Sequence, residues 1–432
     1  MAAQKLRSEA IDRRKTTASE INLLRAVTKP PSAPLRIPGG GANVLPGLGR
    51  GPLDIVRSPH PTSMVTEPSA LQRQVARHIV TRCLRVRPGE NAVIESWDHT
   101  LPIAAAAVDE IRRVGGRTLQ IHEDEGAWWR AIDRKQSRLL GQGSDPEWAA
   151  LKAADIFLHF WGPGDTDRIE RTPEKTFDQA HAWFTPWYAT AQRAGLRGAR
   201  VAVGFATEGR ARQWKLDRRA WEEKILRACL VDPSEFRRPG ARLSRALARG
   251  RKVRITHPNG TDLEVGLAGF GPRLHDGIPH PKDKRYGPAG MLSQIPSGSV
   301  DVALDSTTAE GVIHANRRTN IWWNWNSGGT LEFTGGRLKS YSFDHGGEEF
   351  ARQYRKGSTG RDRTGSLRIG LNPAVGDVPN LETVEFGAVT LSIGNNRAQN
   401  GANSASFMNW VTLAGAEVSV DGVPVLRPKP ES

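Results

Sequence analysis

A glutamate and a histidine four residues apart in the segment DSTTAEGVIHANRR are the first candidates for acid–base chemistry. If this segment is a β-strand, Glu310 and His314 share one face with Val312, because side chains alternate along a strand. A carboxylate and an imidazole on one face can act as a general base and its partner. We therefore predict that Glu310 and His314 are catalytic. The alternative is that both are solvent-facing polar residues of an antiparallel strand.

Neutral polar side chains dominate a second candidate, the segment IGNNRAQNGANSASFMNW, whose one ionisable side chain is Arg397. Amide side chains supply donors and acceptors that can hold an amide, a carboxylate or a ring hydroxyl without a cation. We predict that Asn396, Arg397 and Asn403 bind the substrate. In the segment NIWWNWNSGG, Trp323 is predicted to bind the substrate by stacking on an aromatic ring, and packing inside a β-core is the alternative.

Acids, histidines and aromatic residues also follow three predicted strands, in the segments ESWDHTLP, IHEDEGAWW and FWGPGDTDR. Parallel α/β sheets place ligands at the carboxyl ends of their strands, so these residues predict one wall of a shared cleft, with His99 binding the substrate. The alternative is helix capping and first-turn acids, which use the same residue types. The polar residues concerned are Glu95, Asp98, His99, His122, Glu123, Asp124, Glu125, Asp165 and Asp167.

The elements that position these residues change in type along the chain. From residue 66 to residue 248, predicted strands such as ENAVIESW and ADIFLHFWG alternate with predicted helices such as LPIAAAAVDEIRRVGG. This alternation predicts an α/β domain with a mostly parallel sheet. From residue 249 to residue 428, short strands joined by turns such as PNGT and VDGV predict a β-rich α+β domain.

The first 65 residues are predicted to be a disordered basic leader. They are rich in proline and glycine, and residues 1–63 hold ten Lys or Arg against four Asp or Glu. They lack the continuous apolar segment of a secretory signal. Because the folded pattern begins just after Met64, an upstream start codon assigned to a shorter protein is the alternative to a native leader.

The overall composition excludes several classes of partner. The net charge is +15, but the arginines are spread along the chain and no nucleic-acid-binding motif is present, so no nucleic-acid partner is expected. A solvated arginine-rich surface is the favoured interpretation of this charge, and an acidic substrate is the alternative. No run of 18 uncharged apolar residues exists, so no membrane partner is expected. The two cysteines form neither a CxxC motif nor a disulfide framework, which favours a reducing cytoplasm.

Six motifs occur in an order that resembles a known family. They are RCLRVRPGENAVIES, NGTDLEVGLAG, IPSGSVDVALDSTTAEGVI, RIGLNPAV, FGAVTLSIGNN and NGANSASF. Together they resemble the aminopeptidase T family of thermophilic metallo-aminopeptidases, which includes the iron-dependent 2,5-dihydroxypyridine 5,6-dioxygenases. The resemblance runs from about residue 70 to residue 426. It implies two domains with a cleft between them, and a metal held by carboxylates and histidines of the second domain.

The metal ligands that the resemblance implies are missing from this sequence, where only Glu382 or Glu385 retains a carboxylate. Threonine and methionine are poor ligands for hard or borderline cations, and tryptophan is not a ligand. We therefore expect no metal at these positions and no other cofactor, and leave open a divalent metal bound elsewhere. The residues at the other implied ligand positions are Gly298 or Ser299, Ser366, Thr390, Met408 and Trp410.

The resemblance and the missing ligands together predict a hydrolase of an amide-bearing or heteroaromatic small molecule, whose ancestral metal site is lost or rebuilt. A ring-opening dioxygenase is less favoured because the iron ligands are missing. The alternative is a non-catalytic binding protein on the same scaffold. The sequence leaves open whether the protein is a homodimer.

Overall fold

The computed structural model describes residues 67–286, 288–321 and 324–427, and residues Met64–Ser432 form one compact unit. The predicted leader, residues 1–65, and the predicted stacking residue Trp323 lie outside the described residues. Within the described ranges, no helix is both long enough and apolar enough to cross a membrane.

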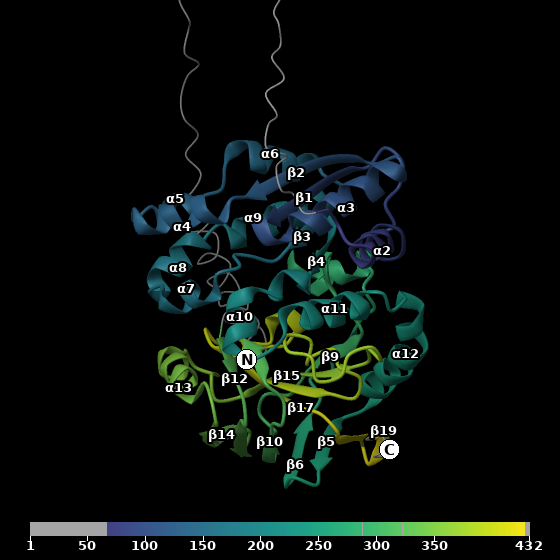
Figure 1. Cartoon of the computed structure of the whole chain (residues 1–432). Helices are drawn as coiled ribbons and strands as arrows, with labels where there is room; N and C mark the ends of the chain where they lie inside the picture. Colours follow the sequence, from purple (N-terminus) through teal and green to yellow (C-terminus); the bar gives the residue numbers. More distant parts are fainter. Residues whose placement is uncertain (1–66, 287, 322–323, 428–432) are drawn as a thin grey trace, which may run out of the picture. The chain divides into compact units, whose positions relative to one another are not determined.

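Five strands form a parallel sheet, in the order β2 (Arg117–Glu123), β1 (Asn91–Trp97), β3 (Ile156–Phe160), β4 (Arg197–Val201) and β8 (Leu292–Ile295) (Figure 1). Strand β1 is buried on both faces, because Ala92 and Ile94 join one apolar core and Val93 joins another. Burial on both faces explains why the consecutive residues Ala92, Val93 and Ile94 are all apolar. Strand β8 comes from beyond residue 249, so the sheet draws on both predicted domains.

Helices cover both faces of the parallel sheet. The face of Ile94 is covered by α2 (Ala70–His78), α3 (Leu101–Arg113) and α11 (Arg218–Cys229), and the face of Val93 by α6 (Asp145–Ala153) and α9 (Phe184–Ala194). A capping box formed by Ser69 and Gln72 starts the first of these helices. The other helices before the antiparallel sheets are α4 (Glu125–Asp133), α5 (Ser137–Leu140), α7 (Thr166–Arg171), α8 (Glu174–Ala180), α10 (Glu208–Gln213) and α12 (Pro233–Arg249).

Two antiparallel sheets follow and bury their inner faces in one shared apolar core. The larger has the order β14 (Arg337–Ser342), β13 (Thr330–Thr334), β10 (Glu310–His314), β6 (Thr261–Gly266), β5 (Lys252–His257), β18 (Glu417–Val420) and β19 (Val423–Leu426). The smaller has the order β17 (Met408–Leu413), β16 (Val389–Gly394), β15 (Thr364–Gly370), β9 (Ser299–Ala303) and β7 (Arg273–His275). A two-stranded ribbon, β11 (Thr319–Ile321) with β12 (Asn324–Asn326), and helix α13 (Gly347–Lys356) complete this part.

These sheets confirm the predicted fold class, an α/β part with a parallel sheet followed by a β-rich part. The predicted turn PNGT is also present, since β5 and β6 pair in antiparallel register around it and form a hairpin. Gly260 in that turn has a φ of 95°, a conformation that favours glycine.

Candidate functional site

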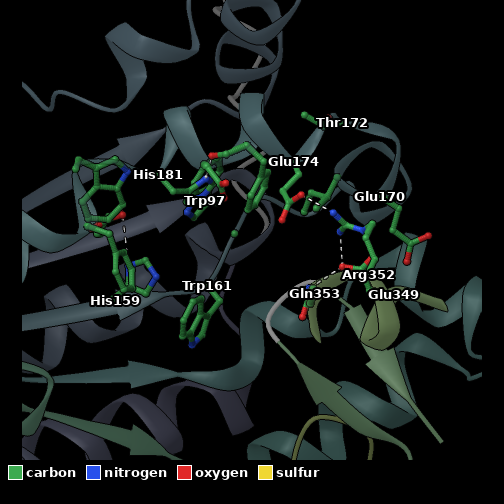
Figure 2. Close-up of a pocket in the computed structure, with 17 residues that line it drawn as sticks. Trp97, His159, Trp161, Glu170, Thr172, Glu174, His181, Glu349, Arg352 and Gln353 are labelled. Atoms are coloured by element: carbon green, nitrogen blue, oxygen red, sulfur yellow. Dashed lines mark hydrogen bonds and ion pairs between the residues drawn. The ribbon is translucent and has the colours of Figure 1, made fainter. Parts of the chain in front are cut away.

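A cavity of about 720 Å³ lies at the carboxyl ends of β1 and β3 (Figure 2). Glu95, Trp97, His159 and Trp161 form its strand-end wall. Helices α7, α8 and α9 contribute a second wall, and α13 contributes a third that includes Arg352. Open α/β sheets bind ligands at this end of their strands, and the volume is typical of a small-molecule site.

The register of the parallel sheet determines which side chains reach the strand-end wall. Glu95, His159 and Arg200 occupy the same register position on β1, β3 and β4. Residues at one register position of a parallel sheet point to the same face, so these side chains form a row across three strands. Trp97 and Trp161 follow two residues later and extend the same face towards the cavity.

A close polar contact joins two residues of the strand-end wall. Nδ1 of His159 lies 3.3 Å from the carboxylate oxygen Oε1 of Glu95. Both side chains are largely buried, with 12% of His159 and 10% of Glu95 exposed. Because Nδ1 faces the carboxylate, a proton is favoured on that nitrogen, and Nε2 retains the lone pair that can accept a proton.

Arg200 places a buried positive charge next to this pair. Its guanidinium carbon lies 5.0 Å, 4.8 Å and 4.7 Å from the ring centroids of Trp161, Phe184 and Tyr188. Burial lowers the pKa of Arg200 to about 9, and the negative charge of Glu95 opposes that shift. The rings therefore hold a cation that is attracted to Glu95 and does not itself line the cavity.

Aromatic rings continue along the helical wall of the cavity. Phe177 stacks on His181 with 4.1 Å between the ring centroids, and Trp183 packs edge-on against Phe184 at 5.5 Å. Burial is the main cause that lowers the pKa of His181, so its neutral imidazole is favoured. Such a ring-rich wall favours a ligand with a flat or apolar body.

Ion pairs connect α8 to α13 beside the cavity, as Figure 2 shows for Glu174, Arg352 and Glu349. Glu174 accepts hydrogen bonds from Arg352 and from Nζ of Lys356, the latter at 2.6 Å. The hydrogen bonds from Lys356 and Arg352 hold the pKa of Glu174 below its usual value. Arg352 also donates to both carboxylate oxygens of Glu349, at 2.8 Å and 2.5 Å. Segments far apart in the sequence are thus joined at the cavity.

The structure brings together the polar residues that follow β1, β2 and β3. Asp98 lies 2.9 Å from Nε2 of His122 and accepts a hydrogen bond from the backbone N–H of Glu125 at 2.9 Å. Glu125 in turn accepts hydrogen bonds from the backbone N–H groups of Gly164 at 3.0 Å and Asp165 at 2.6 Å. This network fixes the three strand ends relative to one another.

His99, the predicted substrate-binding residue, lies in this network and not in the cavity wall. Its Nε2 is 3.1 Å from a backbone carbonyl oxygen, and its Nδ1 is 3.9 Å from Glu125. The pKa of His99 is lowered, mainly because the side chain is buried. Of the strand-end residues predicted to form a cleft wall, Glu95 lines the cavity, whereas Asp124 and Asp165 cap α4 and α7.

Glu310 and His314, the predicted catalytic pair, lie on β10 of the larger antiparallel sheet, and neither lines the cavity. The carboxylate of Glu310 is exposed and accepts a hydrogen bond from the backbone N–H of Gly335. Nδ1 of the half-buried His314 lies 3.0 Å from the hydroxyl oxygen of Thr330, its partner on β13. These contacts match the alternative interpretation, in which both are polar residues of an antiparallel strand.

The asparagines predicted to bind substrate hydrogen-bond to the backbone of their own region. Asn396 is 1% exposed, donates to the carbonyl oxygen of Gly365 at 2.9 Å, and accepts from the backbone N–H of Asn403 at 2.8 Å. Asn403 donates to two backbone carbonyl oxygens, at 2.9 Å and 2.8 Å. Arg397 is exposed and lies outside the cavity wall. The neutral polarity of this loop therefore satisfies buried backbone groups.

The residues at the implied metal-ligand positions also bind protein groups. The hydroxyl of Ser366 lies 2.8 Å from that of a serine on β16, and the hydroxyl of Thr390 lies 2.9 Å from that of a threonine on β17. Glu385 makes two 2.8 Å contacts with Arg317. In the described part of the chain, no group of three His, Cys, Asp or Glu side chains is arranged to hold a metal ion. Paired hydroxyls and an arginine-bound carboxylate do not fit a divalent cation.

Sequence reasoning missed His159 and the residues of α8 and α13. A signal for His159 is present, because Phe157, His159 and Trp161 alternate in the apolar segment IFLHFWG and so share one face. No comparable signal exists for Arg352, since its place at the cavity depends on the packing of distant segments.

No protein-family model matches the sequence, and no curated protein matches it either. Two solved structures are similar in fold. Wild-type AmpT from Thermus thermophilus aligns with a TM-score of 0.62 and 16% identity, over 83% of this chain and 98% of that chain. A 2,5-dihydroxypyridine dioxygenase from Pseudomonas putida KT2440 aligns with a TM-score of 0.55 and 13% identity, over 84% of this chain and 97% of that chain. The predicted resemblance is therefore confirmed at the level of the fold, and the chain has the aminopeptidase T fold.

Proposed function

We propose that the protein is a hydrolase of an amide-bearing or heteroaromatic small molecule, and that it works in the cavity at the ends of β1 and β3. The observation that carries the proposal is the 3.3 Å contact between Glu95 and His159 inside a ring-lined cavity of about 720 Å³. A carboxylate that orients an imidazole is a common arrangement for activating water or a nucleophile.

In the proposed reaction, Glu95 keeps a proton on Nδ1 of His159, so that Nε2 can accept a proton from water. The water oxygen bonds to the carbonyl carbon of the substrate amide and forms a tetrahedral intermediate. The carbon–nitrogen bond then breaks, and the proton on Nε2 passes to the leaving nitrogen. The products are a carboxylic acid and an amine. Glu95 stabilises the imidazolium that exists between the two proton transfers.

The aromatic residues bind and orient the substrate in this proposal. Rings such as Trp97, Phe177 and Trp183 line the cavity and can pack against a planar or apolar substrate. No step runs through a metal, because Ser366, Thr390 and Glu385 at the implied ligand positions are occupied with other protein groups.

A non-catalytic binding protein on the same scaffold is the second candidate. It is favoured by the exchange of the implied metal ligands for hydroxyl pairs such as those of Ser366 and Thr390. Such an exchange keeps the fold and removes the ancestral chemistry while leaving a cavity that can bind a ligand.

A turnover screen tests the proposal. The full chain is incubated with a panel of small aryl and heteroaryl amides in water enriched in heavy oxygen, and products are analysed by mass spectrometry. We expect the label in the acid product and a roughly 10²–10⁴-fold slower reaction in His159→Ala. The control is Glu223→Gln, because Glu223 is an exposed partner of Arg227 on α11. Full turnover in His159→Ala would contradict the proposal, and tight binding of panel compounds with no turnover would favour the binding protein.

A further inference from the structure

The cavity is acidic although the chain as a whole is basic. The chain carries a net charge of +15. A concave wall of one charge sign concentrates ligands of the opposite sign, whatever the net charge of the protein. Among the described residues, the cavity is lined by one guanidinium, Arg352, and by five carboxylates, Glu95, Glu170, Glu174, Asp178 and Glu349.

Three of these carboxylates have no arginine or lysine partner within ion-pair distance in the described ranges. Glu174 and Glu349 share Arg352, and Glu174 also contacts a lysine. Glu170 accepts a hydrogen bond from the neutral side chain of Gln213 at 2.5 Å. Asp178 is exposed. The buried Arg200 does not line the cavity, but it is attracted to Glu95 and offsets part of its charge. The negative charge that no nearby arginine or lysine pairs with therefore comes mainly from Glu170 and Asp178.

Glu95 is the buried member of this set. The residue is 7% exposed, and its one ion-pair contact among the described residues is the 3.3 Å approach of His159 to Oε1. No described residue donates a hydrogen bond to Oε2. Oε2 is not one of the fully buried side-chain atoms that lack a partner, so this oxygen keeps some accessible surface. Because Glu95 lines the cavity, a ligand can supply the donor that the protein does not.

The rings around Glu95 suit a positively charged group. Trp97, Trp161, Phe177, Trp183 and Phe184 all line the cavity. The negative face of an aromatic ring attracts a cation, and the combination of rings with a carboxylate recognises ammonium groups. Two of these rings, Trp161 and Phe184, already lie under the guanidinium of Arg200, so the ligand is expected to meet the other rings of the wall.

We propose that the cavity selects an organic cation, namely a protonated amine or a quaternary ammonium group attached to an aromatic or apolar body. The cationic group meets Oε2 of Glu95, and the body packs against Phe177 and Trp183. Phosphates, sulfonates and carboxylates are repelled by the carboxylates of the wall. This inference names the substrate class of the proposed function and rests on it for the chemistry, but the binding preference can be measured without turnover.

Isothermal titration calorimetry on the full chain tests the preference with three probes of equal size: benzylammonium, benzyl alcohol and benzoate. We expect benzylammonium to bind at least about tenfold more tightly than benzyl alcohol, and benzoate to give no binding heat. Added salt weakens the binding of benzylammonium alone. In Glu95→Gln the affinity for benzylammonium falls to that for benzyl alcohol, whereas Glu223→Gln retains the wild-type preference.

A second variant keeps the test decisive if Glu95→Gln does not fold, as judged by circular dichroism. Asp178→Asn changes an exposed carboxylate and is expected to weaken benzylammonium binding about twofold without affecting benzyl alcohol. Equal affinity for the three probes, tightest binding of benzoate, or no binding of any probe at millimolar concentration would overturn the proposal.

The two proposals fail in different ways. If benzylammonium is preferred and no amide is turned over, the hydrolase is wrong and the cation site stands. If amides are turned over with dependence on His159 but the probes show no preference for positive charge, the cation site is wrong and the hydrolase stands.

Discussion

His159 and Glu95 occupy one register position on adjacent parallel strands, and their side chains meet at 3.3 Å where the two strands end. No loop is needed to bring them together, because the hydrogen-bonded register of β1 and β3 already does so. A pair held by strands keeps its geometry better than a pair held by loops. The cavity wall therefore contains one polar pair whose geometry is set by the parallel sheet.

The first prediction separates the two candidate acid–base pairs. Replacing Glu95 by glutamine removes the charge that orients His159, and turnover of a compound found in the amide screen should fall about 100-fold. Steady-state kinetics of Glu95→Gln, Glu310→Gln and His314→Ala, with Glu223→Gln as control, make the comparison. A loss confined to Glu310→Gln and His314→Ala would move the chemistry to β10, as predicted from the sequence.

The second prediction concerns the asparagine-rich loop. Asn396 is buried and hydrogen-bonded to backbone groups, so Asn396→Ala should lower the free energy of unfolding by about 2 kcal/mol. Arg397 is exposed, and Arg397→Ala should change the same quantity by no more than about 0.5 kcal/mol. Urea unfolding measures both. Unchanged stability of Asn396→Ala together with lost ligand affinity would support the substrate-binding role instead.

The fold can be predicted from the sequence because the signals for it are local and repeated. Alternating strands and helices before residue 249, and short strands joined by turns after it, fix the type of each sheet. Glu95 is recognisable as a strand-end acid for the same reason. His159 was missed because a single histidine inside an apolar strand reads as part of the core, and only the register with β1 shows its partner.

The polar loop shows a different limit. An asparagine that binds a substrate and one that binds a backbone carbonyl offer the same donors and acceptors, so composition cannot distinguish the two uses. In this structure Asn396 and Asn403 donate hydrogen bonds to backbone carbonyl oxygens of β15, β16 and the segment before β15. Arg352 has no local signal at all, because its approach to Glu174 depends on how α8 and α13 pack.

The third prediction concerns metal content. Ser366 and Thr390 at the implied ligand positions are paired with other hydroxyls, and Glu385 is bound by Arg317. We therefore expect purified full-length protein to contain only substoichiometric zinc, manganese, iron and cobalt, as measured by plasma mass spectrometry. Incubation with each metal should leave the melting temperature unchanged, since no site would bind it. One equivalent of a tightly bound metal would contradict this.

The fourth prediction uses pH. Glu123 ends β2 opposite Trp97 of β1. Burial, and then the charges of Glu95 and Glu147, raise the pKa of Glu123 to about 7. An unfolded glutamate titrates near about 4.3, so the folded protein holds this proton more tightly than the unfolded chain. The contribution of Glu123 is favourable below the unfolded pKa and is lost as the pH rises from about 4 to about 7.

Replacing Glu123 by glutamine removes the titration and therefore this loss. At about pH 4 the free energy of unfolding of Glu123→Gln should equal that of the wild type. At about pH 8 it should exceed it by roughly 1–3 kcal/mol, because a pKa difference of about 2.7 corresponds to roughly 3.7 kcal/mol before solvent screening reduces it. Urea unfolding at both pH values measures the difference. Glu147→Gln is the matched comparison, because burial and the charge of Glu95 also raise the pKa of Glu147 and the gain should have the same sign. A gain that is the same at both pH values would show that lost charge repulsion is not its cause.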